Sequence, residues 1–154
     1  MAKEITYTQR VQFGDCDPAR IVWFPNFFRW IDAASQYFFE QCGVPPWHEV
    51  ERTTGVIGTP LVDTQARFIK TASYGDTLDI HVAVKEWRGK SFVQSYRITR
   101  AHVGACGAQP AAAASDPDLI MECAEVRIFA ARRADGKNGI RAVPVPESIR
   151  RLCE

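Results

Sequence analysis

The residue best suited to chemistry in this chain is Asp17. It is followed by Pro18, and a residue before proline is pushed out of the helical region, so the Asp17 side chain is directed away from the local backbone. A carboxylate in that position can attack an acyl carbon, or it can deprotonate the water molecule that does so. Asp-Pro pairs are also common in turns, and this structural alternative stays open.

Phe24 is the second candidate, through its backbone amide. Pro25 is a plausible first residue of a helix and has no N–H, so the free donor at the helix start belongs to Phe24. Such donors stabilise the oxyanion of a tetrahedral centre, and removing one typically costs about 3 kcal/mol. Phe24 is also a plain apolar residue at a helix entry, but that role concerns its side chain and does not exclude the amide.

One long helix must position both groups. The run from Asn26 to Cys42 contains no Pro or Gly, and Gly43 with the following prolines ends it. Its apolar residues cover most of the circumference, as expected for a helix enclosed on nearly all sides: Phe27, Phe28, Trp30, Ile31, Ala33, Ala34, Tyr37, Phe38 and Phe39. Asp32 and Ser35 are exceptions, and we expect both to face apolar surroundings. A carboxylate there needs a partner or a ligand.

The rest of the chain reads mainly as sheet. Ile5, Tyr7, Gln9, Val11 and Phe13 alternate with mostly polar residues, which predicts a half-buried strand. A connector covers Val44 to Thr54. Further strands are predicted by β-branched and aromatic content at Val56 to Lys70, Thr77 to Trp87, Phe92 to His102, Leu119 to Ala131 and Ile140 to Val143. Their spacing implies successive antiparallel neighbours, and a small helix should begin at Pro146-Glu147.

This order of elements predicts an α+β fold in which a long antiparallel sheet wraps around one central helix, the hot-dog arrangement. The length of 154 residues with 46% apolar content fits a single domain, with residues 103–118 as a mobile surface excursion. A curved sheet covers only one side of so apolar a helix. We therefore expect two subunits to pair edge to edge, with the active site between them.

Composition excludes several classes of function. The net charge is +1 without long runs of one sign, which gives no support for binding nucleic acid or a membrane surface. The sequence shows no signal peptide and no apolar run of membrane-spanning length, so we expect a cytoplasmic protein. Five cysteines without CxxC spacing predict reduced thiols, Cys16 included, and three scattered histidines support neither a metal site nor a Ser-His-Asp triad.

Several motifs together resemble the 4-hydroxybenzoyl-CoA thioesterase family of the hot-dog superfamily. They are GDCDPARIVWFPNFFRWIDAAS, CGVPPW, GTPLV, TASYGD and EWRGKSFVQ, and the likeness runs over nearly the whole chain apart from residues 103–118. The resemblance implies hydrolysis of an aryl-CoA thioester by a homotetramer without a cofactor, because coenzyme A is part of the substrate. Asp17 then occupies the position of the essential carboxylate and Phe24 that of the oxyanion contact.

The resemblance also implies substrate contacts. Asp32 lies where a phenol hydroxyl of the acyl group should reach, although a paired helix acid at a subunit contact is the alternative. Trp47 packs over the acyl pocket or serves plain core or interface packing. Thr59, Pro60 and Leu61 match a substrate-channel segment. Arg88, Gly89 and Lys90 match the site for the CoA phosphates, although charges at a hairpin tip are often only solvated.

Two positions depart from the family pattern. Arg20 stands where these loops usually carry glycine, and Gly89 stands where we expect a second basic residue. The acyl group is therefore left open among 4-hydroxybenzoyl, another hydroxy- or amino-substituted benzoyl, and a short aliphatic chain. A non-catalytic oligomer that binds acyl-CoA is the alternative from a different class.

Overall fold

A single antiparallel sheet and one long helix dominate the computed structural model, which describes residues 2–101 and 118–154. The strands are β1 (Glu4–Arg10), β2 (Val56–Gly58), β3 (Leu61–Phe68), β4 (Thr77–Trp87), β5 (Ser91–Arg100), β6 (Asp118–Arg132) and β7 (Ile140–Val143). The helices are α1 (Pro25–Gln41), α2 (Trp47–Thr54) and α3 (Glu147–Cys153), with a short 3-10 turn η1 (Phe13–Asp15). The expected excursion lies outside the described residues, except for Asp118, which begins β6.

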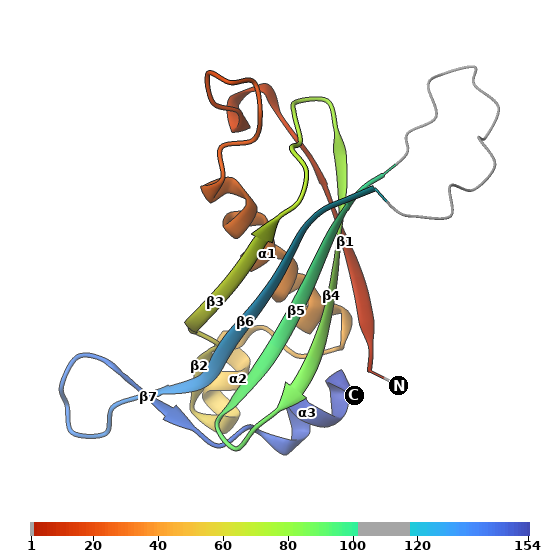
Figure 1. Ribbon diagram of the computed structural model, residues 1–154. Helices are drawn as coiled ribbons and strands as arrows, with labels where there is room; N and C mark the ends of the chain where they lie inside the picture. Colours follow the sequence, from red (N-terminus) through yellow and green to blue (C-terminus); the bar gives the residue numbers. More distant parts are fainter. Residues whose placement is uncertain (1, 102–117) are drawn as a thin grey trace.

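The strand order is β1-β4-β5-β6-β2, and both β3 and β7 also pair with β6 (Figure 1). The expectation of successive neighbours is confirmed for β4, β5 and β6. It is wrong for β3, which pairs with β6 and not with β4. The reason is that β1 takes the place beside β4, where Ile5 pairs with Val82 and Tyr7 with Ile80. The chain therefore crosses the sheet between β3 and β4, and β3 lies beside β6 with its other edge unpaired among the described residues.

Three sequence expectations about local structure are wrong. The first strand ends at Arg10, and Phe13 lies in η1 with 78% of its surface exposed. The connector after α1 contains the helix α2, which begins after Pro46 and ends at Thr54, with Gly55 as its cap. The strand expected from Val56 to Lys70 is broken at Thr59-Pro60, because proline has no N–H to donate to a ladder.

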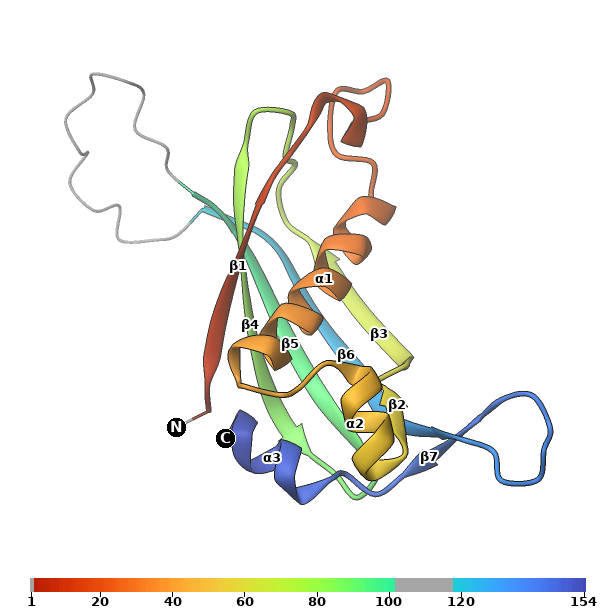
Figure 2. The same cartoon turned by 180° about the vertical axis from the view of Figure 1, so that it is seen from behind.

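The helix α1 lies along one face of the sheet, and their contact forms the core (Figure 2). Helix formation follows the expected signals, with Pro25 as first residue and Gly43 at φ +84° after the end. The Phe39 ring lies 5.8 Å from that of Phe92 and 5.5 Å from that of Trp47. Burying an aromatic side chain of this size contributes about 2–3 kcal/mol, so packing against the sheet provides much of the stability of α1.

One chain leaves part of α1 uncovered. Arg29, Asp32 and Glu40 are exposed, and all eight residues of the neighbouring strand β3 are exposed as well. The Phe68 ring of β3 contacts both Phe27 and Phe28 of the helix. The uncovered side of the helix therefore adjoins the free edge of the sheet, where a second chain would complete the enclosure.

Candidate active site

A tight hairpin presents Asp17. Cys16 and Val22 form an isolated bridge, the Asp17 N–H donates to the Ile21 carbonyl at 2.9 Å, and the Arg20 N–H donates to the Asp17 carbonyl at 2.9 Å. Arg20 closes this turn at φ +66°, the one non-glycine residue with positive φ in the described part of the chain. The left-handed region costs an L-residue roughly 1–2 kcal/mol. Arg20 adopts it nevertheless, so the turn has the backbone shape that glycine would favour and bears this cost.

The connector between β3 and β4 holds the hairpin in place. Ser73 Oγ donates to the Arg20 carbonyl at 2.6 Å, and the Val22 N–H donates to the Ala72 carbonyl at 2.8 Å. The two hydrogen bonds fix the strained side of the turn to the body of the protein. The loop that carries Asp17 is therefore a supported structure and not a free tip.

The Asp17 carboxylate is half-buried and only partly engaged. Its Oδ1 accepts a hydrogen bond from the Ala19 N–H at 2.8 Å, so this oxygen lies against the backbone of the turn. The expectation that the side chain points away from the local backbone is therefore wrong for Oδ1, because the N–H two residues further on lies within its reach. Among the described residues nothing donates to its Oδ2, so this oxygen keeps its lone pairs for a substrate or a water molecule. The geometry suits either a nucleophile or a general base.

The start of α1 offers the expected free amide. Phe24 is at φ −52° and ψ −32°, and the Phe27 N–H donates to its carbonyl at 3.1 Å. The Asn26 N–H donates to the Trp23 carbonyl at 2.9 Å. Pro25 has no N–H, and the Phe24 N–H donates to no other described residue. It is therefore the donor that the first turn leaves available.

Asn26 is a positioning residue that the sequence reading missed. Its side chain is buried, and its Nδ2 donates to the Asp15 carbonyl at 2.8 Å. The Trp23 N–H donates to the same carbonyl at 2.9 Å. The hairpin and the helix start thus share one acceptor, which couples the position of Asp17 to that of the Phe24 amide. An Asn after Pro25 carried no signal of this contact.

Asp32 differs from its sequence expectation. Its side chain is 63% exposed in this chain and does not point into apolar surroundings. The expected need for a partner is met by Arg127 of β6, whose Nη2 donates to Asp32 Oδ1 at 3.0 Å. The reason is that Asp32 lies on the side of α1 that the sheet of one chain leaves uncovered.

A buried polar network surrounds Arg127, and the sequence reading missed it. The Arg127 Nε donates to Glu125 Oε2 at 2.8 Å, and both side chains are almost wholly buried. The Tyr96 hydroxyl lies 2.8 Å from the same carboxylate oxygen and 2.9 Å from Gln94 Oε1, to which Ser35 Oγ donates at 2.7 Å. The two-residue alternation of β6 could have revealed this network, because it places Glu125 and Arg127 on the same strand face as buried Phe129.

The environment fixes the protonation of two members of this network. Burial, and next the Glu125 carboxylate, raise the pKa of Tyr96 well above its usual value, so the phenol is neutral and donates. Burial opposes the charge on Arg127, but contacts with Tyr96, Glu125 and Asp32 raise the pKa of its guanidinium overall. Arg127 is therefore a permanent cation inside the sheet.

Among the other acyl-site candidates, Trp47 packs on α1 and the segment 59–61 lies beside Arg127. Trp47 is half-buried, and its Nε1 donates to Gln36 Oε1 at 2.6 Å while its ring packs on Phe39, so it is firmly part of the helix packing. The Thr59 carbonyl accepts from Arg127 Nη1 at 3.1 Å, and the Pro60 carbonyl accepts from the Ile128 N–H at 3.1 Å. Leu61 is the strand partner of Arg127 and is 45% exposed.

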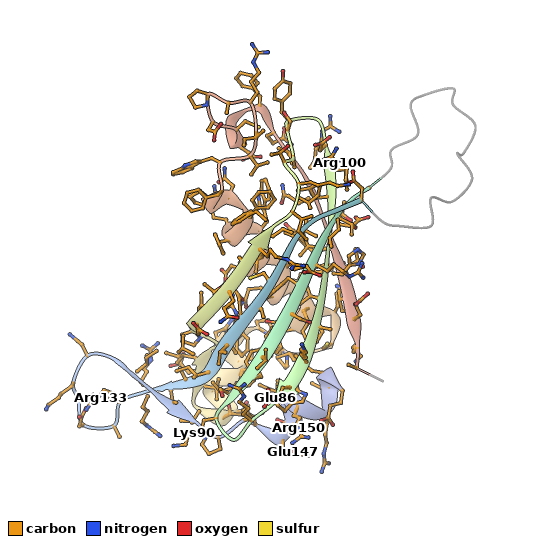
Figure 3. The ribbon with its side chains drawn as sticks, in the orientation of Figure 1. Glu86, Lys90, Arg100, Arg133, Glu147 and Arg150 are labelled. Atoms are coloured by element: carbon orange, nitrogen blue, oxygen red, sulfur yellow. The ribbon has the colours of Figure 1, made fainter. Side chains whose placement is uncertain are left out.

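The expected phosphate clamp lies at the turn between β4 and β5. Arg88 binds Glu86 through two contacts of 3.0 Å, and this pairing lowers the pKa of Glu86. Lys90 is exposed, and the Gly89 carbonyl accepts from the Val145 N–H at 3.0 Å. Figure 3 shows Glu86 and Lys90 at the opposite end of the sheet from the loop with Asp17. The structure therefore does not bring the clamp and Asp17 together within one chain.

The family is decided by sequence comparison. Residues 11–152 match the Thioesterase-like superfamily. The chain belongs to this superfamily. A relative in Pseudomonas sp. (strain CBS-3), 4-hydroxybenzoyl-CoA thioesterase, is 46% identical over 153 residues, and the match covers 99% of both chains. The predictions of the hot-dog fold and of a thioesterase are confirmed.

Solved structures of other members of the superfamily superimpose closely on this thioesterase. The D17N mutant of 4-hydroxybenzoyl-CoA thioesterase, complexed with 4-hydroxybenzoyl-CoA, has a TM-score of 0.85 and 42% identity, with coverage of 99% of this chain and 100% of the other. A gentisyl-coenzyme A thioesterase has a TM-score of 0.71 and 25% identity, with coverage of 95% and 99% respectively.

Within residues 2–101 and 118–154, no three His, Cys, Asp or Glu side chains gather as metal ligands, and no helix is long and apolar enough to span a membrane. The four cysteines in these ranges are free thiols. Burial raises the pKa of Cys42 and Cys123, which opposes a nucleophilic role for either.

Proposed function

We propose that this thioesterase hydrolyses an aromatic acyl-CoA, either 4-hydroxybenzoyl-CoA or a related substituted benzoyl-CoA, to the free acid and CoA. The observation that carries the proposal is the pairing of a half-engaged Asp17 carboxylate with a helix start whose Phe24 amide has no acceptor among the described residues. The 46% identity to the Pseudomonas enzyme over its whole length supports the choice of substrate.

In the proposed reaction the thioester carbonyl oxygen accepts a hydrogen bond from the Phe24 N–H. The charge that develops on this oxygen is then stabilised at the positive end of α1. Asp17 either attacks the carbonyl carbon, which releases the CoA thiolate and leaves a mixed anhydride for water to open, or it takes a proton from the attacking water. Both routes need only water, the substrate and the side chains present, so the proposal includes no cofactor.

Asp32 is proposed to accept a hydrogen bond from a hydroxyl group on the aryl ring. Arg127 occupies its Oδ1, and Oδ2 accepts no hydrogen bond from the described residues. An acceptor carboxylate disfavours an unsubstituted ring, because the buried oxygen would lose its partner on substrate binding. The segment 59–61 would then border the ring, since it adjoins Arg127 as well. Trp47 is proposed to border the ring by the family resemblance.

The site is proposed to form between subunits. Asp17 and the turn with Lys90 lie at opposite ends of one chain, so a single substrate reaches both most directly when they come from different chains (Figure 3). The unpaired edge of β3 carries exposed Leu61, Val62 and Phe68, and it adjoins the exposed Asp32 on α1. Pairing of two β3 edges would cover these groups. We propose a homodimer at least and a tetramer by analogy with the resembling family.

A cytoplasmic location is part of the same proposal. It is supported by the free thiols of Cys16, Cys42, Cys123 and Cys153, which suit a reducing compartment.

A panel of acyl-CoA substrates tests the function. We expect the highest kcat/KM with 4-hydroxybenzoyl-CoA or another ring-substituted benzoyl-CoA, a lower value with benzoyl-CoA, and the lowest with acetyl-CoA. A preference for short aliphatic chains would replace the aromatic assignment. CoA binding without turnover of any thioester would show that the protein is a non-catalytic oligomer that binds acyl-CoA.

A further inference from the structure

Arg127 connects two parts of the proposed acyl pocket. Its Nη2 donates to Asp32 on α1 at 3.0 Å, and its Nη1 donates to the Thr59 carbonyl at 3.1 Å. The Arg127 side chain is only 4% exposed, whereas that of Asp32 is 63% exposed. One rigid, buried guanidinium therefore fixes the position of a carboxylate on the helix and of the segment that begins at Thr59.

Arg127 is held in turn by a network that returns to the same helix. The Glu125 carboxylate accepts a hydrogen bond from Arg127 Nε at 2.8 Å. Hydrogen bonds through Tyr96 and Gln94 then connect Glu125 to Ser35. Ser35 lies three residues after Asp32 on α1, so the network begins and ends within about one helical turn. It thereby fixes the rotation of α1 against β5 and β6 at the position of Asp32.

The network is costly as a means of stability alone. A buried Arg–Glu pair loses hydration that its mutual attraction barely restores, and apolar residues of similar volume are often as stable or more so. Gln94 Nε2 and Thr59 Oγ1 are buried without a partner among the described residues, which adds to the cost. Such an arrangement is expected where the exact placement of a functional group matters more than stability.

We propose that Arg127 is a positioning residue that determines specificity: it holds Asp32 so that Oδ2 receives a hydrogen-bond donor at the far end of an aryl acyl group. The inference rests on the proposed function and deepens it. The substrates selected in this way are aryl thioesters with a ring hydroxyl or amino group. A ring carboxylate would be rejected by the Asp32 charge.

The test is Arg127→Lys, which keeps a cation beside Glu125. A lysine ammonium cannot reproduce the planar geometry that serves Glu125, Thr59 and Asp32 together. The measured quantity is the ratio of kcat/KM for 4-hydroxybenzoyl-CoA to that for benzoyl-CoA. We expect this ratio to fall by about 10- to 100-fold, the range that a hydrogen bond to a charged group supplies. Adding Asp32→Asn to Arg127→Lys should lower it no further.

Arg132→Met is the matched control. Arg132 lies on the same strand but is exposed and binds half-buried Glu51 at 2.7 Å, so its loss should leave the ratio at the wild-type value. Where Arg127→Lys fails to fold, the double variant Glu125→Gln/Arg127→Met removes both buried charges at similar volume. The same fall in the ratio is expected there.

A folded Arg127→Lys enzyme with the wild-type ratio would overturn the inference, and so would a ratio that Asp32→Asn lowers further in that background. If the wild-type enzyme prefers the hydroxylated substrate and only Asp32→Asn removes the preference, the positioning role fails while the proposed function stands. If the wild-type enzyme hydrolyses no aryl-CoA, the proposed function and the inference fail together.

Discussion

Arg127 Nη2 donates to Asp32 Oδ1 at 3.0 Å, so an exposed carboxylate on α1 is held by a cation buried in β6. The position of Asp32 is therefore set by the sheet as well as by its own helix. The contact joins residues that are 95 positions apart in the sequence. It places a charged acceptor beside the free edge of β3, where we propose that a second subunit and the acyl group meet.

Replacing Phe24 by proline tests the oxyanion donor. The residue has φ −52°, close to the value that proline imposes, so Phe24→Pro removes the N–H without requiring a new φ at this position. We expect kcat to fall by about 100- to 1,000-fold, the usual effect of losing one oxyanion donor. Phe24→Ala keeps the N–H and serves as the control. Equal kcat values for the two variants would exclude the amide role.

Arg20→Gly should stabilise the protein. Glycine adopts φ +66° without the steric cost that Arg20 bears, and the two hydrogen bonds from Ser73 and Val22 do not involve the Arg20 side chain. We expect the free energy of unfolding to rise by about 1 kcal/mol and Tm by about 2–4 °C. Thermal unfolding of both proteins measures this. A lower Tm for the glycine variant would show that Arg20 makes a stabilising contact outweighing its strain.

His81 should make the stability depend on pH. Its ring nitrogens lie 3.1 Å from Thr6 Oγ1 and 3.0 Å from Thr99 Oγ1, and burial, followed by the charge of Arg97, lowers its pKa below the usual 6.5. The unfolded chain therefore binds a proton at His81 more readily than the folded chain does. The contribution of His81 to the free energy of unfolding is therefore fully present above the usual pKa of 6.5. It is lost as the pH falls from that value toward the lowered pKa of the folded state.

His81→Gln provides the comparison for this effect. The glutamine keeps hydrogen-bonding atoms and does not titrate, so its stability should fall less than that of the wild type between about pH 7 and pH 5. Denaturation by urea at each pH measures the difference. Equal slopes in the two proteins would contradict the role given to His81.

The edge of β3 should control assembly. Val62 is 56% exposed on this edge strand, and Val62→Lys places a charge where the second chain is proposed to pair. Sedimentation should show a shift from dimer or larger species to monomer, with loss of activity. Thr8→Lys makes the same kind of change on β1, the opposite edge, and should leave assembly intact. A Val62→Lys protein that assembles like the wild type would exclude this interface.

Local signals explain why much of the fold could be predicted from the sequence. Pro25 and Gly43 mark the two ends of α1, and the residues of β4 and β7 match their predicted ranges. Asp17 and Phe24 belong to a short segment whose geometry depends on neighbouring residues. The short helix α2 was missed although Pro46 and Gly55 flank it, because eight residues with one buried apolar position give little periodicity.

Long-range partners could not be predicted. Nothing in the spacing of the strands shows that β3 crosses to β6, because this depends on which edge β1 occupies. The contact of Asp32 with Arg127 follows from that arrangement. The alternation of β6 places Glu125 and Arg127 on a buried face, but it does not say which residues of other elements receive their hydrogen bonds.

The central claim is that Asp17 acts on the acyl carbon, and Asp17→Asn tests it most directly. The amide keeps an acceptor for the Ala19 N–H, so the loop should retain its shape, whereas the nucleophile or base is lost. With saturating 4-hydroxybenzoyl-CoA we predict a fall in kcat of at least about 100-fold, with Tm and substrate affinity close to those of the wild type. A variant that keeps the wild-type kcat would contradict the claim.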